Sequence, residues 1–212
     1  MESKLSLACI SLSRTGHVRI EKENVNGLHD QSQREHTQRR QDSPRQGRAC
    51  ARRGEGRWGQ QLPERVGRGV SLQFAFASYM AHVAEDEVAK DGSVRVRRVV
   101  CAVDCGTVVN PDTVRAQVQS GIIFGITAAL YGKITVKNGR VEQSNFDSYQ
   151  ILRMNEAPAI EVHIVQSSEP PGGMGEAGTS CIPAAVTNAI FAATGKRLRK
   201  LPVDTAALKQ SA

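Results

Sequence analysis

A glycine-rich loop near the C-terminus carries the side chain best placed to do chemistry. Residues 170–179 read PPGGMGEAGT, and Glu176 is the one ionisable side chain among them. Glycines let a backbone approach a bulky ligand closely, and free N–H groups at a helix N-terminus suit anionic oxygens. A carboxylate here either caps the following helix or acts as a general base, and the residues alone favour neither function.

The same loop satisfies the spacing of a dinucleotide-binding motif. Gly173, Gly175 and Gly178 match G-x-G-x-x-G. Two prolines, however, separate the preceding strand from the first glycine, and the basic run KRLR at 196–199 replaces the acidic residue expected about 20 positions later. The segment that remains after the last helix is also too short for a βαβ unit, so a nucleotide-binding fold of this type is not expected.

The strands that would position this loop follow from alternating polar and apolar residues. One alternating run covers residues 70–80, and a turn at 90–92 separates it from a second strand at 94–104. Another strand covers 160–165, IEVHIV. Between them, residues 137–139 (KNG) carry the Asn-Gly signal of a tight hairpin.

Two main helices complete the expected fold. Asn110, followed by a proline, predicts the N-cap of the first helix, and Gly132 stands where a C-cap glycine is expected. Thr179 or Ser180 would cap the second helix, and Gly195 would close it. Two helices grouped with mixed or antiparallel strands predict an α+β fold.

The first third of the chain has a different composition. Residues 1–66 hold 13 Lys and Arg against 8 Asp and Glu, whereas residues 67–212 hold 15 against 13. Residues 29–61 contain no Val, Ile, Leu, Met, Phe or Tyr, so they have little to bury and are expected to be disordered in isolation. An arginine-rich arm can bind nucleic acid, but Trp58 alone would stack on bases, so nucleic acid is not expected as a partner. We therefore separate a basic, disordered or non-native segment, 1–66, from a folded part, 67–212.

Other sequence features narrow the class of protein. No run of about 18 apolar residues predicts a membrane span, and the start carries no convincing export signal, so a cytoplasmic location is expected. Gly121 and Gly125 predict close packing of two helices in the core, and His82 and His163 are expected to be packing or surface residues. No metal ligand is assigned, because the five cysteines form no C-x-x-C pair: Cys9, Cys50, Cys101, Cys105 and Cys181.

Four motifs in chain order carry a resemblance to a known family. Residues 171–179, PGGMGEAGT, resemble the P-G-G-x-G-E-P-G-T loop of the xanthine dehydrogenase and aldehyde oxidase superfamily. Residues 98–111, RVVCAVDCGTVVNP, resemble the strand and turn before its glutamine-rich helix, and residues 117–125, QVQSGIIFG, are similar to that helix. Residues 153–158, RMNEAP, resemble the branch that contains the isoquinoline 1-oxidoreductase β-subunit.

The resemblance implies a fold, a site and a reaction. The chain would be the C-terminal part of the molybdopterin-binding domain in the large subunit of a molybdenum hydroxylase. Glu176 would be the general base, Gln117 would contact the cofactor, and Gly121 and Gly175 would approach it closely. The cofactor would be molybdopterin cytosine dinucleotide and the partner a small [2Fe-2S] iron–sulfur subunit. The substrate would be an aromatic N-heterocycle or an aldehyde, hydroxylated at an electron-poor carbon with water as the oxygen source.

The sequence departs from the family in two ways. Ala177 replaces the usual proline of the loop, and Ser120 stands where the family often has a small or acidic residue. In the family, most cofactor contacts lie in segments that precede those found in this chain. The fragment alone is therefore expected to be inactive, and the alternative is a non-catalytic truncated remnant or interaction module without cofactor.

Overall fold

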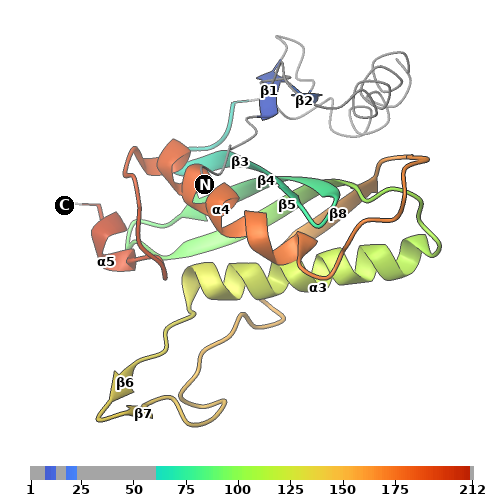
Figure 1. The fold of residues 1–212 in the computed structure, drawn as a ribbon. Coiled ribbons are helices and arrows are strands. Elements are labelled where there is room, and N and C mark those ends of the chain that lie inside the picture. The colour runs from blue at the N-terminus through green and yellow to red at the C-terminus, as the bar shows by residue number, and fades with distance from the viewer. Residues whose placement is uncertain (1–7, 13–17, 23–60, 211–212) are drawn as a thin grey trace, which may run out of the picture. The chain divides into compact units, whose positions relative to one another are not determined.

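The structure is a computed structural model that describes residues 8–12, 18–22 and 61–210 (Figure 1). It divides into two compact units, Met1–Gln61 and Leu62–Ala212. In the first unit, β1 (Ala8–Leu12) pairs antiparallel with β2 (Val18–Lys22). We expected residues 29–61 to be disordered. Residues 29–60 lie outside the described part of the chain, so the structure does not test this expectation.

The second unit is built on a four-stranded mixed sheet. Its order is β3 (Val66–Ala75), β4 (Ser78–Val88), β5 (Val94–Asp104) and β8 (Ala159–Ile164). The first three strands are antiparallel neighbours, whereas β8 runs parallel to β5. A parallel pair requires a long crossover connection, and here the crossover contains a helix. The strands expected at 94–104 and 160–165 are confirmed.

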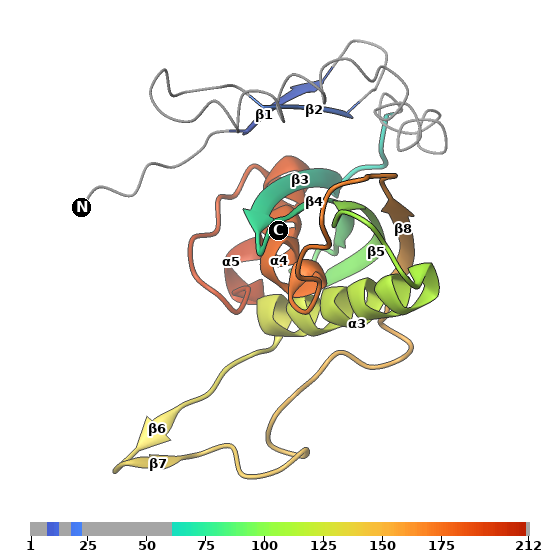
Figure 2. The same cartoon turned by 45° about the vertical axis from the view of Figure 1, so that its right-hand side comes forward.

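Two long helices pack beside the sheet, as Figures 1 and 2 show. They are α3 (Pro111–Leu130) and α4 (Ala177–Thr194), and a short helix, α5 (Thr205–Leu208), follows near the C-terminus. Apolar residues of both long helices share one buried cluster with β4 and β5; its members include Val88, Val99, Ile122, Ile126, Ile182, Val186 and Ile190. The expected α+β class is confirmed. Among the described residues, no helix is both long and apolar enough to cross a membrane.

Glycines allow α4 to approach its neighbours backbone to backbone. A Cβ atom on Gly69 would collide with the Ala185 carbonyl oxygen and would lie 2.7 Å from the Asn188 carbonyl carbon. At the helix–helix contact, a Cβ on Gly121 would lie 3.0 Å from the Cα of Gly178. The close helix packing expected from the glycines of α3 is therefore confirmed, and it fixes the position of α4.

The alternating run at 70–80 was expected to be one strand, and this was wrong. The chain turns back at Phe76 and Ala77, with φ angles of 53° and 59°, so that Ala75 pairs with Ser78. Both residues adopt the left-handed conformation that glycine or asparagine usually supplies in such turns, so neither residue type predicts a turn here. The turn lies close to the loop that carries Glu176.

The helix ends confirm some expectations and correct others. Asn110 caps α3, since its side-chain oxygen accepts from the N–H groups of Asp112 and Thr113, at 3.0 and 3.1 Å. The C-cap is Tyr131, and Gly132 does not take the left-handed conformation expected of it. α4 begins at Ala177, so Thr179 lies inside its first turn and is not the cap. Ser180 is not the cap either, because its N–H and that of Thr179 donate to the backbone carbonyl of Glu176, the residue before the helix.

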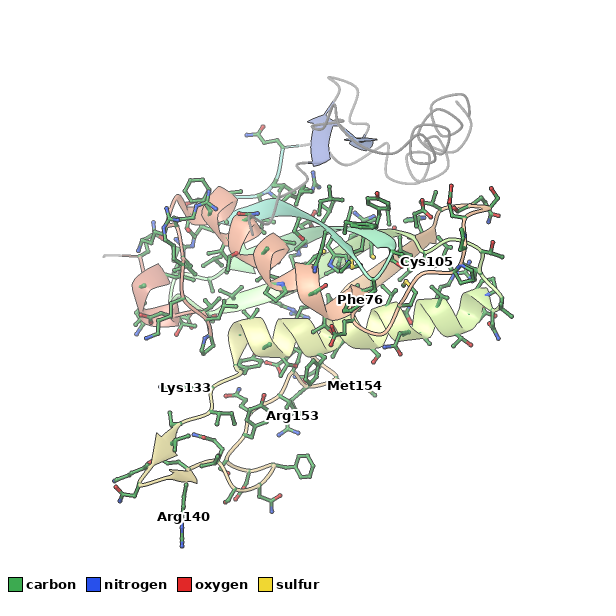
Figure 3. All side chains as sticks on the ribbon, in the orientation of Figure 1. Phe76, Cys105, Lys133, Arg140, Arg153 and Met154 are labelled. Atoms are coloured by element: carbon green, nitrogen blue, oxygen red, sulfur yellow. The ribbon has the colours of Figure 1, made fainter. Side chains whose placement is uncertain are left out.

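An arm joins α3 to β8 and extends away from the sheet (Figure 3). Its hairpin pairs β6 (Val136–Lys137) with β7 (Arg140–Val141) through a left-handed Asn138-Gly139 turn, as the sequence predicted. The root of the arm is held by Tyr131, whose hydroxyl donates to Glu156 at 2.7 Å. Burial and this bond raise the pKa of Tyr131 to about 12.

His82 and Asp86 are fully buried on β4, and within the described part of the chain neither side chain has a hydrogen-bond partner. The expectation that His82 is a packing residue agrees with its burial. Burial lowers the pKa of His82 to about 4, so the histidine is neutral at physiological pH. Burial, and then the charge of Glu85, raise the pKa of Asp86 well above its ordinary value. An unpartnered buried polar group costs stability.

We expect Gly69→Ala to destabilise the fold by about 2 kcal/mol or more, because the added methyl group would overlap the backbone of α4. Urea unfolding measures the change. Gly175→Ala is the control, because nothing lies within 4 Å of a Cβ at that position, and it should change stability by less than about 1 kcal/mol. Equal stability of the two variants would contradict the close approach of α4.

Asp86→Asn should stabilise the protein at pH 7.5 but not at pH 4. The raised pKa means that the folded state holds a proton that the unfolded chain releases above about pH 4. The stability contributed by that proton is present below this pH and is lost as the pH rises. The gain should therefore be present at pH 7.5 and absent at pH 4, because asparagine has no proton to lose.

Denaturant unfolding at both pH values checks this, with Asp147→Asn on the exposed arm as the matched control. His82 acts in the opposite sense, because its lowered pKa removes stability as the pH falls from 6.5 towards 4. An Asp86→Asn advantage of the same size at both pH values would show that this carboxyl is not linked to protons.

Candidate active site

Glu176 occupies the N-cap position of α4 without capping it. Its backbone lies at φ −117° and ψ 5°, and its side chain makes no cap hydrogen bond. The N–H groups of Thr179 and Ser180 bond instead to the backbone carbonyl of Glu176, at 3.0 and 3.1 Å. The residue is exposed. Of the two functions left open by the sequence, capping is therefore not the one that this carboxylate performs.

The loop before Glu176 is held to the end of the sheet by three hydrogen bonds. The Gly172 N–H donates to the Cys105 carbonyl at 2.8 Å, and the Gly173 N–H donates to the Phe76 carbonyl at 2.7 Å. The buried Ser78 hydroxyl donates to the Gly173 carbonyl at 2.9 Å. Phe76 and Cys105, labelled in Figure 3, thus belong to two separate turns that together support the loop.

Glycine is required at some positions of this loop and gives open space at another. A Cβ on Gly172 would collide with the Ser78 hydroxyl and would lie 2.7 Å from the Ala77 carbonyl oxygen. A Cβ on Gly173 would lie 2.8 Å from that of Phe76. At Gly175, by contrast, nothing lies within 4 Å, and the residue is exposed. The backbone beside Glu176 is therefore open to a ligand.

Gln117 reaches this loop from α3. Its side-chain amide donates to the Gly175 carbonyl at 2.7 Å, and both residues are exposed. Three of the residues expected at the site, Gln117, Gly175 and Glu176, are thus brought together from segments 58 positions apart.

Gly121, which the resemblance places beside the cofactor, lies at the contact between the two helices. It is buried against Gly178 of α4, and the Thr179 hydroxyl donates to its carbonyl at 3.2 Å. The close approach that its lack of a side chain permits is therefore made to a helix. Because α4 covers it, the structure offers a ligand no direct route to Gly121.

Sequence reasoning missed the groups that support the loop. Ser78 and the carbonyls of Phe76 and Cys105 carry no motif, since a backbone carbonyl is present at every position. Gly106 was the one residue whose type could have indicated this contact. Its φ of 74° lets the turn after β5 pass close to residues 169 and 170. There the Thr107 N–H donates to the Glu169 carbonyl at 2.8 Å.

The described residues contain no group of three or more His, Cys, Asp or Glu side chains that could hold a metal ion. Two buried thiols lie near the loop. Burial, followed by the charge of Asp104, raises the pKa of Cys105, and burial raises the pKa of Cys181 to about 11. The exposed groups of the site are the Glu176 carboxylate, the Gln117 amide and the open backbone of Gly175.

Comparison with known proteins agrees with this description. Residues 16–158 match the molybdopterin cofactor-binding domain. The chain is 40% identical over 146 residues to the isoquinoline 1-oxidoreductase subunit beta of Brevundimonas diminuta, which covers 66% of the chain and 19% of that subunit. The family match includes Gln117 and ends before the glycine loop.

Solved structures give the same relationship. Quinoline 2-oxidoreductase from Pseudomonas putida 86 superposes with a TM-score of 0.54 and 26% identity, over 59% of this chain and 17% of that one. The aldehyde oxidoreductase from Desulfovibrio desulfuricans ATCC 27774 gives the same TM-score and identity, over 63% of this chain and 16% of that one.

The chain spans about a fifth of the length of its curated relative, and less of the two solved structures. The family match covers more than half of the chain and starts within the basic segment 1–66. The chain therefore belongs to the molybdopterin cofactor-binding domain family, and it is similar to the isoquinoline 1-oxidoreductase subunit beta and to the xanthine dehydrogenase molybdenum-binding subunit of Escherichia coli O157:H7.

Proposed function

We propose that this chain is the C-terminal part of the large subunit of a molybdenum hydroxylase, in which Glu176 is the general base. The observation that carries the proposal is an exposed carboxylate that does not cap its helix and follows a loop held by two turns and by Gln117. A general base must be accessible to its proton and held in a fixed direction. The exposed, uncapped carboxylate supports the first requirement, and the held loop supports the second.

The residues present fit one side of a bound molybdopterin cofactor. The Gly175 backbone is open, the helix N-terminus lacks a side-chain cap, and Gln117 is exposed beside both. Backbone N–H groups and an amide suit the polar and anionic groups of a pterin. We propose that Gln117 and Gly175 lie along the cofactor in its cytosine dinucleotide form. The cofactor, when bound, supplies the redox chemistry.

In this proposal the protein's own contribution is proton transfer. Glu176 accepts a proton from water, which supplies the oxygen. As the new C–O bond forms at the electron-poor carbon, the C–H bond there breaks, and its hydrogen leaves as a proton and two electrons, which the bound cofactor would take up. The relatives named above, an isoquinoline oxidoreductase subunit, a quinoline oxidoreductase and an aldehyde oxidoreductase, favour an aromatic N-heterocycle or an aldehyde as substrate. The electrons would leave through a separate [2Fe-2S] subunit, and the name of one relative, a subunit beta, supports an assembly of more than one chain.

We also propose that residues 67–212 form the C-terminal part of the cofactor-binding domain and that residues 1–66 are a separate basic segment. The alternative that the sequence left open is a non-catalytic module without cofactor. Metal analysis of the purified chain separates the two. Molybdenum near one atom per chain would support the hydroxylase, whereas its absence, with dye binding to exposed apolar surface, would support the module.

We expect Glu176→Gln, in a large subunit that carries this segment, to lower turnover at least about a hundredfold. The amide keeps the size of the side chain but cannot accept the proton, and a positioned base contributes about that factor. Molybdenum content and the unfolding midpoint should stay at their unsubstituted values, because the carboxylate is exposed.

Glu142→Gln on the exposed arm makes the same chemical change away from the site and should leave turnover unaltered. Steady-state kinetics with the two variants side by side measures the difference. Turnover of Glu176→Gln at the unsubstituted rate would reject this residue as the base.

A further inference from the structure

We propose that Gln117 is a positioning residue, which fixes the direction of Glu176 by holding the carbonyl of Gly175. The inference rests on the proposed function of Glu176 and adds a second residue to it. The resemblance implies that Gln117 contacts the cofactor; the structure gives its amide a partner within the protein itself.

The geometry of the peptide bond turns this contact into control of Glu176. The Gly175 carbonyl and the Glu176 N–H belong to one planar group. A donor at 2.7 Å from the carbonyl oxygen therefore sets the orientation of the plane that leads into the Cα atom of Glu176. The direction in which the carboxylate leaves the backbone follows from that plane.

This part of the loop needs such a restraint. Gly172 and Gly173 are held by the two turns, and the helical bonds start with the carbonyl of Glu176. Between these points, Gly175 has no side chain and no atom within 4 Å of a potential Cβ, so packing does not fix it. Glycine also has the widest choice of backbone conformations. The Gln117 amide restrains the loop where packing does not.

Gln117 stands on a rigid support. Its neighbour Val118 is fully buried, and the start of α3 is capped by Asn110. The close contact between Gly121 and Gly178 fixes α3 relative to α4. This bond uses one N–H of the Gln117 amide, so its amide oxygen and second N–H can still contact a ligand. Holding the loop and contacting a cofactor are therefore compatible.

Hydrogen exchange in the unliganded chain tests the proposal. Gln117→Met keeps the length of the side chain and removes its donor. Three backbone amides form hydrogen bonds within or beside the loop: those of Gly173, Thr179 and Ser180. They should exchange roughly two- to tenfold faster, which is the factor expected from the loss of one hydrogen bond's net stabilisation. The core amide of Val99 should exchange at the unsubstituted rate. The Glu176 amide resonance should shift, because the carbonyl of its peptide has lost a donor.

Gln119→Met is the matched control, since residue 119 is an exposed glutamine on the same helix. It should leave the loop amides and the Glu176 resonance unchanged. Unchanged loop exchange in Gln117→Met would overturn the proposal. A rise that includes Val99 would also overturn it, because Gln117 would then support the fold as a whole. Neither readout depends on turnover, so a failure of Glu176 as the base would not alter this result.

Discussion

The closeness of α4 to its neighbours is the constraint on which the candidate site depends. Gly69 in the sheet and the Gly121–Gly178 contact between the helices bring backbone against backbone with no room for a Cβ atom. Contacts of this kind tolerate little displacement, because protein interiors are close-packed. The N-terminus of α4, and with it Glu176, is therefore located by the core of the unit. The geometry of the site and the stability of the fold share the same contacts.

The parts of the fold that could be predicted are those set by one or two residues. Asn138-Gly139 needs only its own conformational preference to form the hairpin turn, and Asn110 caps α3 with its own side chain. The turn at Phe76 and Ala77 has no such local preference. It is held by a hydrogen bond from the Gly173 N–H to the Phe76 carbonyl, which is a tertiary interaction between residues almost 100 positions apart. The sequence could not reveal it.

The candidate site was predictable in its residues but not in its connections. The loop motif identified Glu176 and Gly175, and the helix motif identified Gln117. Which groups hold the loop depends on how α3 and the turns come together, and Ser78 takes part only because β4 starts beside Gly173. Gly121 was placed at the cofactor because its spacing matches a motif, yet the lack of a side chain that suits a ligand suits a helix equally well.

The arm between α3 and β8 leaves and rejoins the body at points tied together by Tyr131 and Glu156. A loop whose two ends are tied together can change in length at a small entropic cost, because the entropy lost on closing a loop grows only with the logarithm of its length. Insertions and deletions in this arm would therefore leave the register of β5 and β8 intact. The arm is the place where related proteins can diverge in size, and where a foreign peptide could be grafted without disturbing the glycine contacts that locate α4.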